Sequence, residues 1–210
     1  MRVAILSESS ADEAAIRILL DGILGKQTEE IKPPQLRSRG WPSVIRVLPT
    51  VLKFLHYQTD AEALVVIADS DDSPTHQSTH DEAEGANQQC RLCQLRGVVS
   101  VETNNLRPVI GRNQIKTAIG LAVPAIEAWY LCGLDSQINE AAWTRKLQSE
   151  RITYTRRTLK KDVYNTERPT IDIETAQARQ AAIRLVNELQ LLEQLFPNGF
   201  GAFASDVRNW

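Results

Sequence analysis

The sequence predicts an α/β fold built on a mainly parallel β-sheet, followed by a helical extension. Short apolar runs bounded by polar residues occur at Val3–Leu6, Leu64–Ala68 and Ile115–Val123. Runs of this length that are rich in β-branched residues are typical of strands buried on both faces. Helical patterns separate the first strands, and this alternation favours parallel strands joined by right-handed crossovers. We therefore expect an α/β domain at residues 1–133, with a helical extension at 134–210 packed on it.

The composition is that of a globular protein with a substantial core. Hydrophobic residues make up 42% of the 210 residues, which suits one domain or one domain with an appendage. The net charge of −2 gives no bulk attraction to nucleic acid or to a membrane surface, so nucleic-acid contacts would need a local patch. Three cysteines do not suggest a disulfide scaffold. With no membrane-length apolar run and no signal peptide recognised, we expect a cytoplasmic protein without a membrane partner.

The first strand is followed by a helix with signals at both ends. Apolar residues recur at helical spacing over residues 11–24. Ser10 and Glu13 have the spacing of a capping box at the start of this helix. Gly25 is a typical C-terminal stop. These signals predict a strand, a polar turn and a helix as the first unit.

The remaining elements are predicted from similar patterns. Residues 29–39 indicate a weaker second strand broken by two prolines, and the helix that follows has Pro42 in its first turn and a kink at Pro49. The later predicted elements are strands at Val98–Val101 and Ile115–Val123, then helices at Ala125–Cys132, 138–150 and 178–196. The aromatic tail, Phe200–Trp210, is expected to pack on the rest of the protein.

Three acidic residues follow the strand at Leu64–Ala68 immediately. Asp69, Asp71 and Asp72 lie at its carboxyl end, where open parallel sheets bind ligands. Acids this close repel one another unless protons or a cation compensate them. Mg²⁺ or Mn²⁺ suits such oxygen ligands. An acidic turn that caps the next helix is an equally good interpretation of this stretch alone.

Two further glutamates are candidates for the same site. Glu8 ends the first strand, so it should reach the edge of the sheet that Asp69 occupies if the two strands are parallel. Glu127 is isolated in an apolar helix. Such an acid either interacts with the helix start or belongs to a site, and residue chemistry alone slightly favours the first role.

Two other segments have competing interpretations. His76, His80, Cys90 and Cys93 have residue types that bind zinc. The length of the loop and the His-before-Cys order favour instead a solvated loop leading into a helix whose cysteines face the core. The basic run at 151–161 is either a phosphate-binding patch opposite the acids or a solvated helix face, and the balanced charge of the chain favours the second.

Together, these motifs resemble the TOPRIM fold of topoisomerases, bacterial primases, recombination-mediator proteins and overcoming-lysogenisation-defect nucleases. The resemblance lies in Glu8 within Leu-Ser-Glu-Ser-Ser-Ala-Asp-Glu and in Asp69 and Asp71 within Ile-Ala-Asp-Ser-Asp-Asp. The chain is also similar to small stand-alone TOPRIM-like proteins of unassigned function, in which Glu127 falls in a Glu-Ala-Trp element. It departs from the pattern in the Ser-Ser after Glu8, where many members have Gly, and in the His/Cys segment.

The resemblance implies a three-layer Rossmann-like fold and Mg²⁺- or Mn²⁺-dependent phosphodiester hydrolysis, as in a small nuclease of a phage-defence or mobile-element system. Asp69 and Asp71 would hold the metal, with Glu8 as ligand or general base. Asp72 and Glu127 would be additional ligands. Candidate phosphate-binding residues are Arg37, Arg39 and Arg112.

Nucleic acid, DNA or RNA, is the partner that the resemblance implies, and a partner protein from the same system is another expectation. Two other functions remain open. One is a non-catalytic TOPRIM-like module that binds a nucleotide or a protein, and the other is a small-molecule phosphatase. The residues of the chain do not decide among these.

Overall fold

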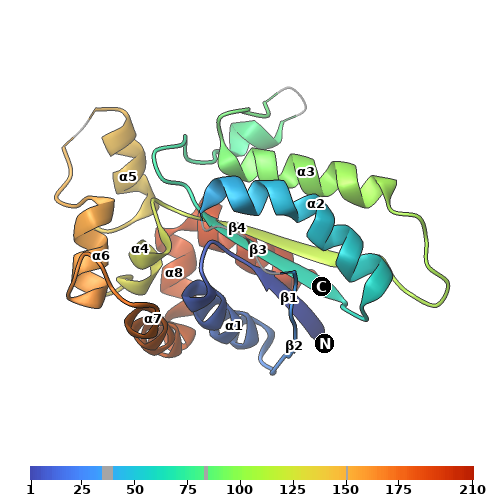
Figure 1. The fold of residues 1–210 in the computed structure, drawn as a ribbon. Coiled ribbons are helices and arrows are strands. Elements are labelled where there is room, and N and C mark those ends of the chain that lie inside the picture. The colour runs from blue at the N-terminus through green and yellow to red at the C-terminus, as the bar shows by residue number, and fades with distance from the viewer. Residues whose placement is uncertain (35–39, 83–84, 150) are drawn as a thin grey trace.

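A parallel sheet of four strands forms the centre of the protein in its computed structural model (Figure 1), which describes residues 1–34, 40–82, 85–149 and 151–210. The strand order is β2-β1-β3-β4. The strands are β1 (Arg2–Leu6), β2 (Glu29–Ile31), β3 (Ala63–Asp69) and β4 (Lys116–Ala122). The predicted α/β class with a parallel sheet is therefore confirmed.

The register of the central strands brings the end of β1 and the end of β3 to the same edge. Leu6 pairs with Val66 in the β1–β3 ladder, and Asp69 pairs with Ala122 in the β3–β4 ladder. The residues after Leu6 therefore continue beside the last three residues of β3. This edge, at the carboxyl ends of the strands, is called the carboxyl edge below.

Helices cover both faces of the sheet and bury its alternating side chains (Figure 1). On one face, Val3, Ile5 and Val65 belong to a cluster with apolar residues of α1 (Ser10–Leu24), α7 (Ile171–Leu185) and α9 (Ala202–Arg208). On the other face, Leu6 and Val66 lie in a cluster with residues of α2 (Trp41–Gln58) and α3 (Arg91–Asn105). Because successive strand residues point to opposite faces, both sides of the sheet need such a cover. This arrangement gives three layers.

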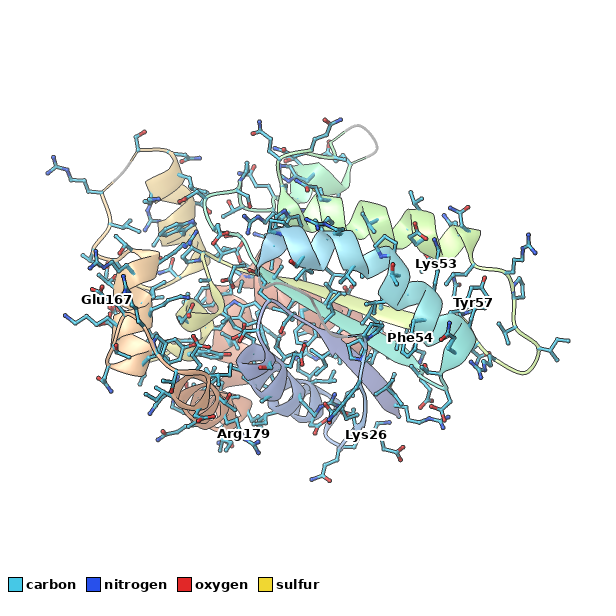
Figure 2. All side chains as sticks on the ribbon, viewed as in Figure 1. Lys26, Lys53, Phe54, Tyr57, Glu167 and Arg179 are labelled. Carbon is cyan, nitrogen blue, oxygen red and sulfur yellow. The ribbon has the colours of Figure 1, made fainter. Side chains whose placement is uncertain are left out.

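Charged side chains on the outer helices point away from these cores (Figure 2). Lys53 on α2 and Glu167, after α6 (Arg156–Tyr164), are exposed. Among the described residues, no helix has both the length and the apolarity that crossing a membrane requires.

The ends of α1 follow the chemistry of its sequence, with a shift of one residue at its start. The N-cap is Ser9, whose hydroxyl accepts a hydrogen bond from the Ala11 amide, rather than Ser10. At the other end, Gly25 adopts a left-handed conformation with φ of 64° and donates to the Gly22 carbonyl, as a helix stop does. The strand-turn-helix prediction is confirmed.

The C-terminal extension packs on the α1 face and closes one edge of the sheet. It contains α5 (Glu140–Leu147), α6, α7, α8 (Leu189–Leu195) and α9, after the short α4 (Ile126–Tyr130). Phe200 and Phe203 are fully buried, so the tail packs as expected. The Asp206 carboxylate accepts a hydrogen bond from the Ile119 amide of β4 at 3.1 Å. The extension thus covers the β4 edge, which would otherwise expose unpaired backbone groups.

Three sequence predictions are wrong in detail. Val98–Val101 is not a strand but lies inside α3, because Leu92, Leu95 and Val99 repeat at helical spacing and are buried against the sheet. Residues 178–196 do not form one helix, since a 3₁₀ turn at Val186–Glu188 separates α7 from α8. The second strand has only three residues.

Candidate functional site

Glu8 and Asp69 meet at the carboxyl edge, as the sequence predicts. The Asp69 amide donates a hydrogen bond to Glu8 Oε1 at 3.0 Å. Asp69 Oδ1 accepts from the Ile126 amide at 3.0 Å, at the start of α4. Residues separated by 61 positions in the chain are thereby in direct contact.

The turn after β3 is fixed by the connection that follows β4. The Ser70 amide donates to the Ala122 carbonyl at 2.7 Å, and the Asp71 amide donates to the Pro124 carbonyl at 2.8 Å. Asp71 has a φ of 51°, a left-handed conformation that Asp tolerates better than most residues. Its carbonyl also accepts from the Trp143 indole at 3.2 Å. These contacts hold Asp71 next to Asp69, whereas Asp72 is exposed and pairs with Lys146 at 3.1 Å.

Two more acids face the same place from α4 and α1. Glu127 is only 4% exposed, and its Oε2 has no hydrogen-bond partner in the part of the chain that the structure describes. Its Oε1 lies 3.8 Å from Lys160 Nζ. Asp12, in the first turn of α1, accepts a hydrogen bond from the Tyr130 hydroxyl at 3.4 Å. We call Glu8, Asp12, Asp69, Asp71 and Glu127 the acidic cluster.

The sequence analysis missed Asp12. It follows Glu8 by four residues, inside the stretch that carries the resemblance, but was given no role of its own. The available signal was its place in the first turn of a helix that begins at the carboxyl edge. A carboxylate there faces whatever that edge binds.

The pKa values in the acidic cluster show that the protein leaves its negative charge poorly compensated. Burial raises the pKa of Asp69 well above its ordinary value, and the charges of Glu127 and Glu8 raise it further. Burial and Glu127 likewise raise the pKa of Asp12. The pKa values of Glu8 and Glu127 are also raised, mainly by burial, although Lys160 opposes the shift at Glu127. Carboxylates crowded in this way bind protons or a cation more readily than isolated ones.

Positively charged side chains lie next to the acidic cluster. Arg91 Nη1 lies 2.8 Å from Asp71 Oδ2 and donates to the Asp69 carbonyl at 2.6 Å. Arg156 forms an ion pair with Asp71, and Lys160 approaches Glu127, both from α6. The basic run therefore contributes two cations to the acidic cluster, contrary to the favoured interpretation of a purely solvated face.

The predicted phosphate-binding arginines are not brought to the acidic cluster. Arg112 precedes β4 and donates to the carbonyls of His56 and Thr59, before β3, so it lies at the opposite edge of the sheet. Its assignment to this site was wrong, because a loop that enters a parallel strand lies at the amino edge. Arg37 and Arg39 lie outside the described residues.

The His/Cys segment forms a group that could hold a metal ion. The nearest donor atoms of His76, His80, Cys90 and Cys93 all lie within 4.8 Å of one another. His76 Nδ1 is 3.7 Å from Cys90 Sγ and 3.6 Å from Cys93 Sγ, and His80 Nδ1 is 3.7 Å from Cys93 Sγ. The structure thus brings together the side chains that the sequence interpretation had left in a loop and a core. We call these four residues the His/Cys group.

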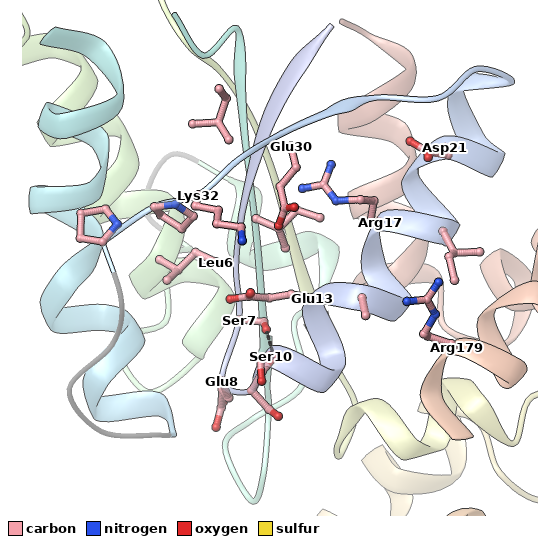
Figure 3. Close-up of a pocket in the computed structure, with 17 residues that line it drawn as sticks. Leu6, Ser7, Glu8, Ser10, Glu13, Arg17, Asp21, Glu30, Lys32 and Arg179 are labelled. Carbon is pink, nitrogen blue, oxygen red and sulfur yellow. Dashed lines mark hydrogen bonds between the residues drawn. The ribbon is translucent and has the colours of Figure 1, made fainter. Parts of the chain in front are cut away.

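A cavity of about 870 Å³ adjoins Glu8 along β1, β2 and α1 (Figure 3). Its walls carry both signs of charge, with Arg17 and Lys32 beside Glu13 and Glu30. Burial raises the pKa of Glu13 to about 7. The cavity is therefore polar and opens next to one member of the acidic cluster.

Comparisons with protein-family models, with curated proteins and with solved structures gave no match for this chain. The functional interpretation therefore depends on the geometry of the acidic cluster and of the His/Cys group.

Proposed function

We propose that the protein hydrolyses phosphodiester bonds with Mg²⁺ or Mn²⁺ bound by the acidic cluster. The observation that carries this proposal is that Asp69 interacts electrostatically with four other carboxylates, from α1, α4 and the turns after β1 and β3. One of them is the buried Glu127, whose Oε2 has no hydrogen-bond partner among the described residues. The TOPRIM-like motifs in the sequence supply the same residues in the same order, apart from Asp12.

The donor set fits a hard divalent cation. All five side chains offer carboxylate oxygens, which Mg²⁺ and Mn²⁺ prefer over softer ligands. When bound, such an ion would polarise a phosphoryl oxygen and stabilise the charge that develops during hydrolysis. Burial raises the pKa values of Asp69 and Asp12, repulsion from neighbouring carboxylates raises them further, and a bound cation would relieve this repulsion.

The side chains of the protein would have distinct tasks. Asp69 and Asp71 hold the ion, and Glu8 serves as a further ligand or accepts a proton from the attacking water. Arg91 and Arg156 now pair with Asp71, so they are placed to contact a substrate phosphate there. Lys160 is placed similarly beside Glu127.

A second candidate substrate class is a small phosphoester such as a nucleotide. The cavity beside Glu8 favours it, because its volume is comparable to that of ordinary small-molecule sites. The net charge of −2 also gives no general attraction to a polyanion. Both candidates use the same acidic cluster.

For the His/Cys group, we propose Zn²⁺ in a structural role. Two thiolates and two imidazoles are a frequent donor set of tetrahedral structural zinc. From ordinary zinc bond lengths, a sulfur and a nitrogen ligand should lie about 3.6 Å apart. The three sulfur–nitrogen distances of 3.6 to 3.7 Å in this group agree with that value.

The proposed activity is tested with Asp69→Asn and the matched control Asp72→Asn. Cleavage of single-stranded DNA, RNA, plasmid and a nucleotide phosphoester would be measured with Mn²⁺. We expect Asp69→Asn to lower the rate at least about 10²-fold, because it removes a group that stabilises the transition state. We expect Asp72→Asn to stay within about fivefold of wild type, since exposed ion pairs contribute little.

An unchanged rate in Asp69→Asn would refute hydrolysis at the acidic cluster. Absence of Mn²⁺-dependent turnover on every substrate, together with thermal stabilisation by a nucleotide, would favour the non-catalytic module instead.

A further inference from the structure

The His/Cys group and the acidic cluster are joined by a single helical turn. Cys90 is the N-cap of α3, Arg91 is its first residue, and Cys93 lies in the same turn. Cys90 and Cys93 belong to the His/Cys group, whereas the Arg91 side chain reaches the acidic cluster. Any interaction that fixes the backbone of this turn therefore also fixes the point from which the Arg91 side chain extends toward the acidic cluster.

Arg91 makes three contacts on the side of the acidic cluster. Its Nη1 contacts the Asp69 carbonyl at 2.6 Å and Asp71 Oδ2 at 2.8 Å. Its guanidinium carbon lies 4.9 Å from the centre of the Trp41 ring, a cation–π arrangement. Trp41 is the first residue of α2, so the guanidinium bridges α2 and the turn after β3.

The His/Cys group has an orienting contact typical of metal ligands. His76 Nε2 lies 3.2 Å from Asp81 Oδ2. Arg96 Nη1 lies 2.7 Å from Asp81 Oδ1 and 3.3 Å from His76 Nε2, so it holds this carboxylate in place. In the tautomer that donates from Nε2 to Asp81, Nδ1 faces the two thiols with its lone pair free for a metal.

We propose that Zn²⁺ in the His/Cys group positions Arg91 at the acidic cluster. The zinc ion fixes the first turn of α3 through Cys90 and Cys93, and this turn sets the guanidinium against Asp71. The position of Arg91 thus depends on a metal centre outside the reacting site. This inference rests on the proposed divalent-cation site in the acidic cluster, but not on the reaction catalysed there.

The test measures Mn²⁺ affinity of the acidic cluster by electron paramagnetic resonance, independently of catalysis. The variants are Arg91→Ala, Cys93→Ser and the double variant. Arg91 competes with a cation for Asp71, so we expect Arg91→Ala to tighten Mn²⁺ binding about fivefold. Cys93→Ser, which lacks zinc, should tighten it similarly, and the double variant should show no further change.

The matched control is Lys160→Ala, since Lys160 comes from α6 and approaches Glu127 rather than Asp71. Its effect on Mn²⁺ affinity should multiply with that of Cys93→Ser, because the two changes act on different carboxylates. If zinc had a purely structural role, the effects of Arg91→Ala and Cys93→Ser on Mn²⁺ affinity would multiply as well. That result would overturn the proposal.

A second arm uses the wild-type chain, in case Cys93→Ser does not fold. Zinc is removed with a chelator, the chelator is removed by desalting, and one equivalent of Zn²⁺ is then restored, with circular dichroism to follow the fold. We expect Mn²⁺ binding to tighten on zinc removal and to return on restoration. No change in Mn²⁺ affinity would refute the coupling.

The outcomes separate this inference from the proposed function. Protein that binds Mn²⁺ with the predicted coupling but cleaves no phosphoester refutes hydrolysis and supports the positioning role. Protein that cleaves but shows independent Arg91 and zinc effects refutes the positioning role alone. Absence of Mn²⁺ binding in wild type refutes both.

Discussion

The acidic cluster and the His/Cys group are both proposed here as metal sites, but the fold assembles them in opposite ways. The acidic cluster draws residues from α1, β3, α4 and the turns after β1 and β3, far apart in the sequence. The His/Cys group comes from one stretch of 18 residues, His76–Cys93. The first is a product of sheet topology, and the second of a local loop and one helical turn.

The two regions also differ in the charge that remains without a metal. The acidic cluster keeps carboxylates whose pKa values are raised by burial and by one another. The His/Cys group consists of donors that can all be neutral. Crowded charge costs stability and is expected where it serves a site, whereas neutral donors suit a structural centre. Metal should therefore matter for activity in the first region and for folding in the second.

The largest predicted effect on stability is the loss of zinc from the His/Cys group. We expect Cys93→Ser to lower the thermal midpoint by about 10 °C or more. A structural zinc ion contributes several kcal/mol, and each kcal/mol shifts the midpoint by about 2–4 °C at this chain length. The measurement is calorimetry together with the zinc content of the purified protein.

Cys132→Ala is the matched control for zinc loss. Cys132 is a free, buried cysteine outside the His/Cys group. This variant should keep one equivalent of zinc and lose less stability than Cys93→Ser. If purified wild-type protein contained no zinc, or if both variants lost equal thermal stability, the His/Cys group would not be a structural zinc centre.

The acidic cluster should respond in the opposite direction when one charge is removed. The pKa of Glu127 is raised above 4.5, mainly by burial. The folded state then binds more protons than the unfolded chain from about pH 4.5 up to the raised pKa, so the free energy of unfolding falls as pH rises through that window. We expect Glu127→Gln to stabilise the metal-free protein by about 1–2 kcal/mol at pH 8, because the cost of the charge grows as pH rises through the raised pKa.

Urea unfolding of wild type and Glu127→Gln at pH 5 and pH 8, with and without Mg²⁺, measures this effect. The gain should be smaller at pH 5 than at pH 8, because the cost of the charge decreases as pH falls through the raised pKa of Glu127, and it should disappear with Mg²⁺, which compensates the charge. If Glu127→Gln destabilises the protein at pH 8, the burial of the Glu127 charge does not cost the folded state free energy as proposed.

The smallest predicted effect concerns Arg112, at the opposite edge of the sheet. Arg112→Ala should lower the free energy of unfolding by about 1 kcal/mol, because hydrogen bonds to the His56 and Thr59 carbonyls are lost. It should leave phosphoester cleavage within experimental error of wild type. Urea unfolding measures the free energy of unfolding, and the Mn²⁺-dependent assay measures the cleavage rate. A tenfold loss of cleavage in Arg112→Ala would mean that Arg112 acts at the acidic cluster after all.

Some features could be predicted because they depend on neighbouring residues. The strands β1, β3 and β4 are short apolar runs, and the stop of α1 at Gly25 depends on one residue that tolerates positive φ. Val98–Val101 shows the limit of such local reasoning. Its valines favour a strand, but burial of Leu92, Leu95 and Val99 against the sheet makes the segment helical.

The sequence by itself determined where β1, β3 and β4 lie along the chain, and that Glu8 and Asp69 come at or just after the end of a strand, because these properties follow from periodicity over a few residues. Only the tertiary structure decided that Asp12, Arg156 and Lys160 face the acids, that Arg112 does not, and that four His and Cys donors converge. These positions depend on how α1 packs on the sheet, how α6 packs on α4 and α7, and how the loop before α3 is folded. Packing is the sum of many weak contacts between residues that lie far apart in the sequence, and no local pattern encodes them.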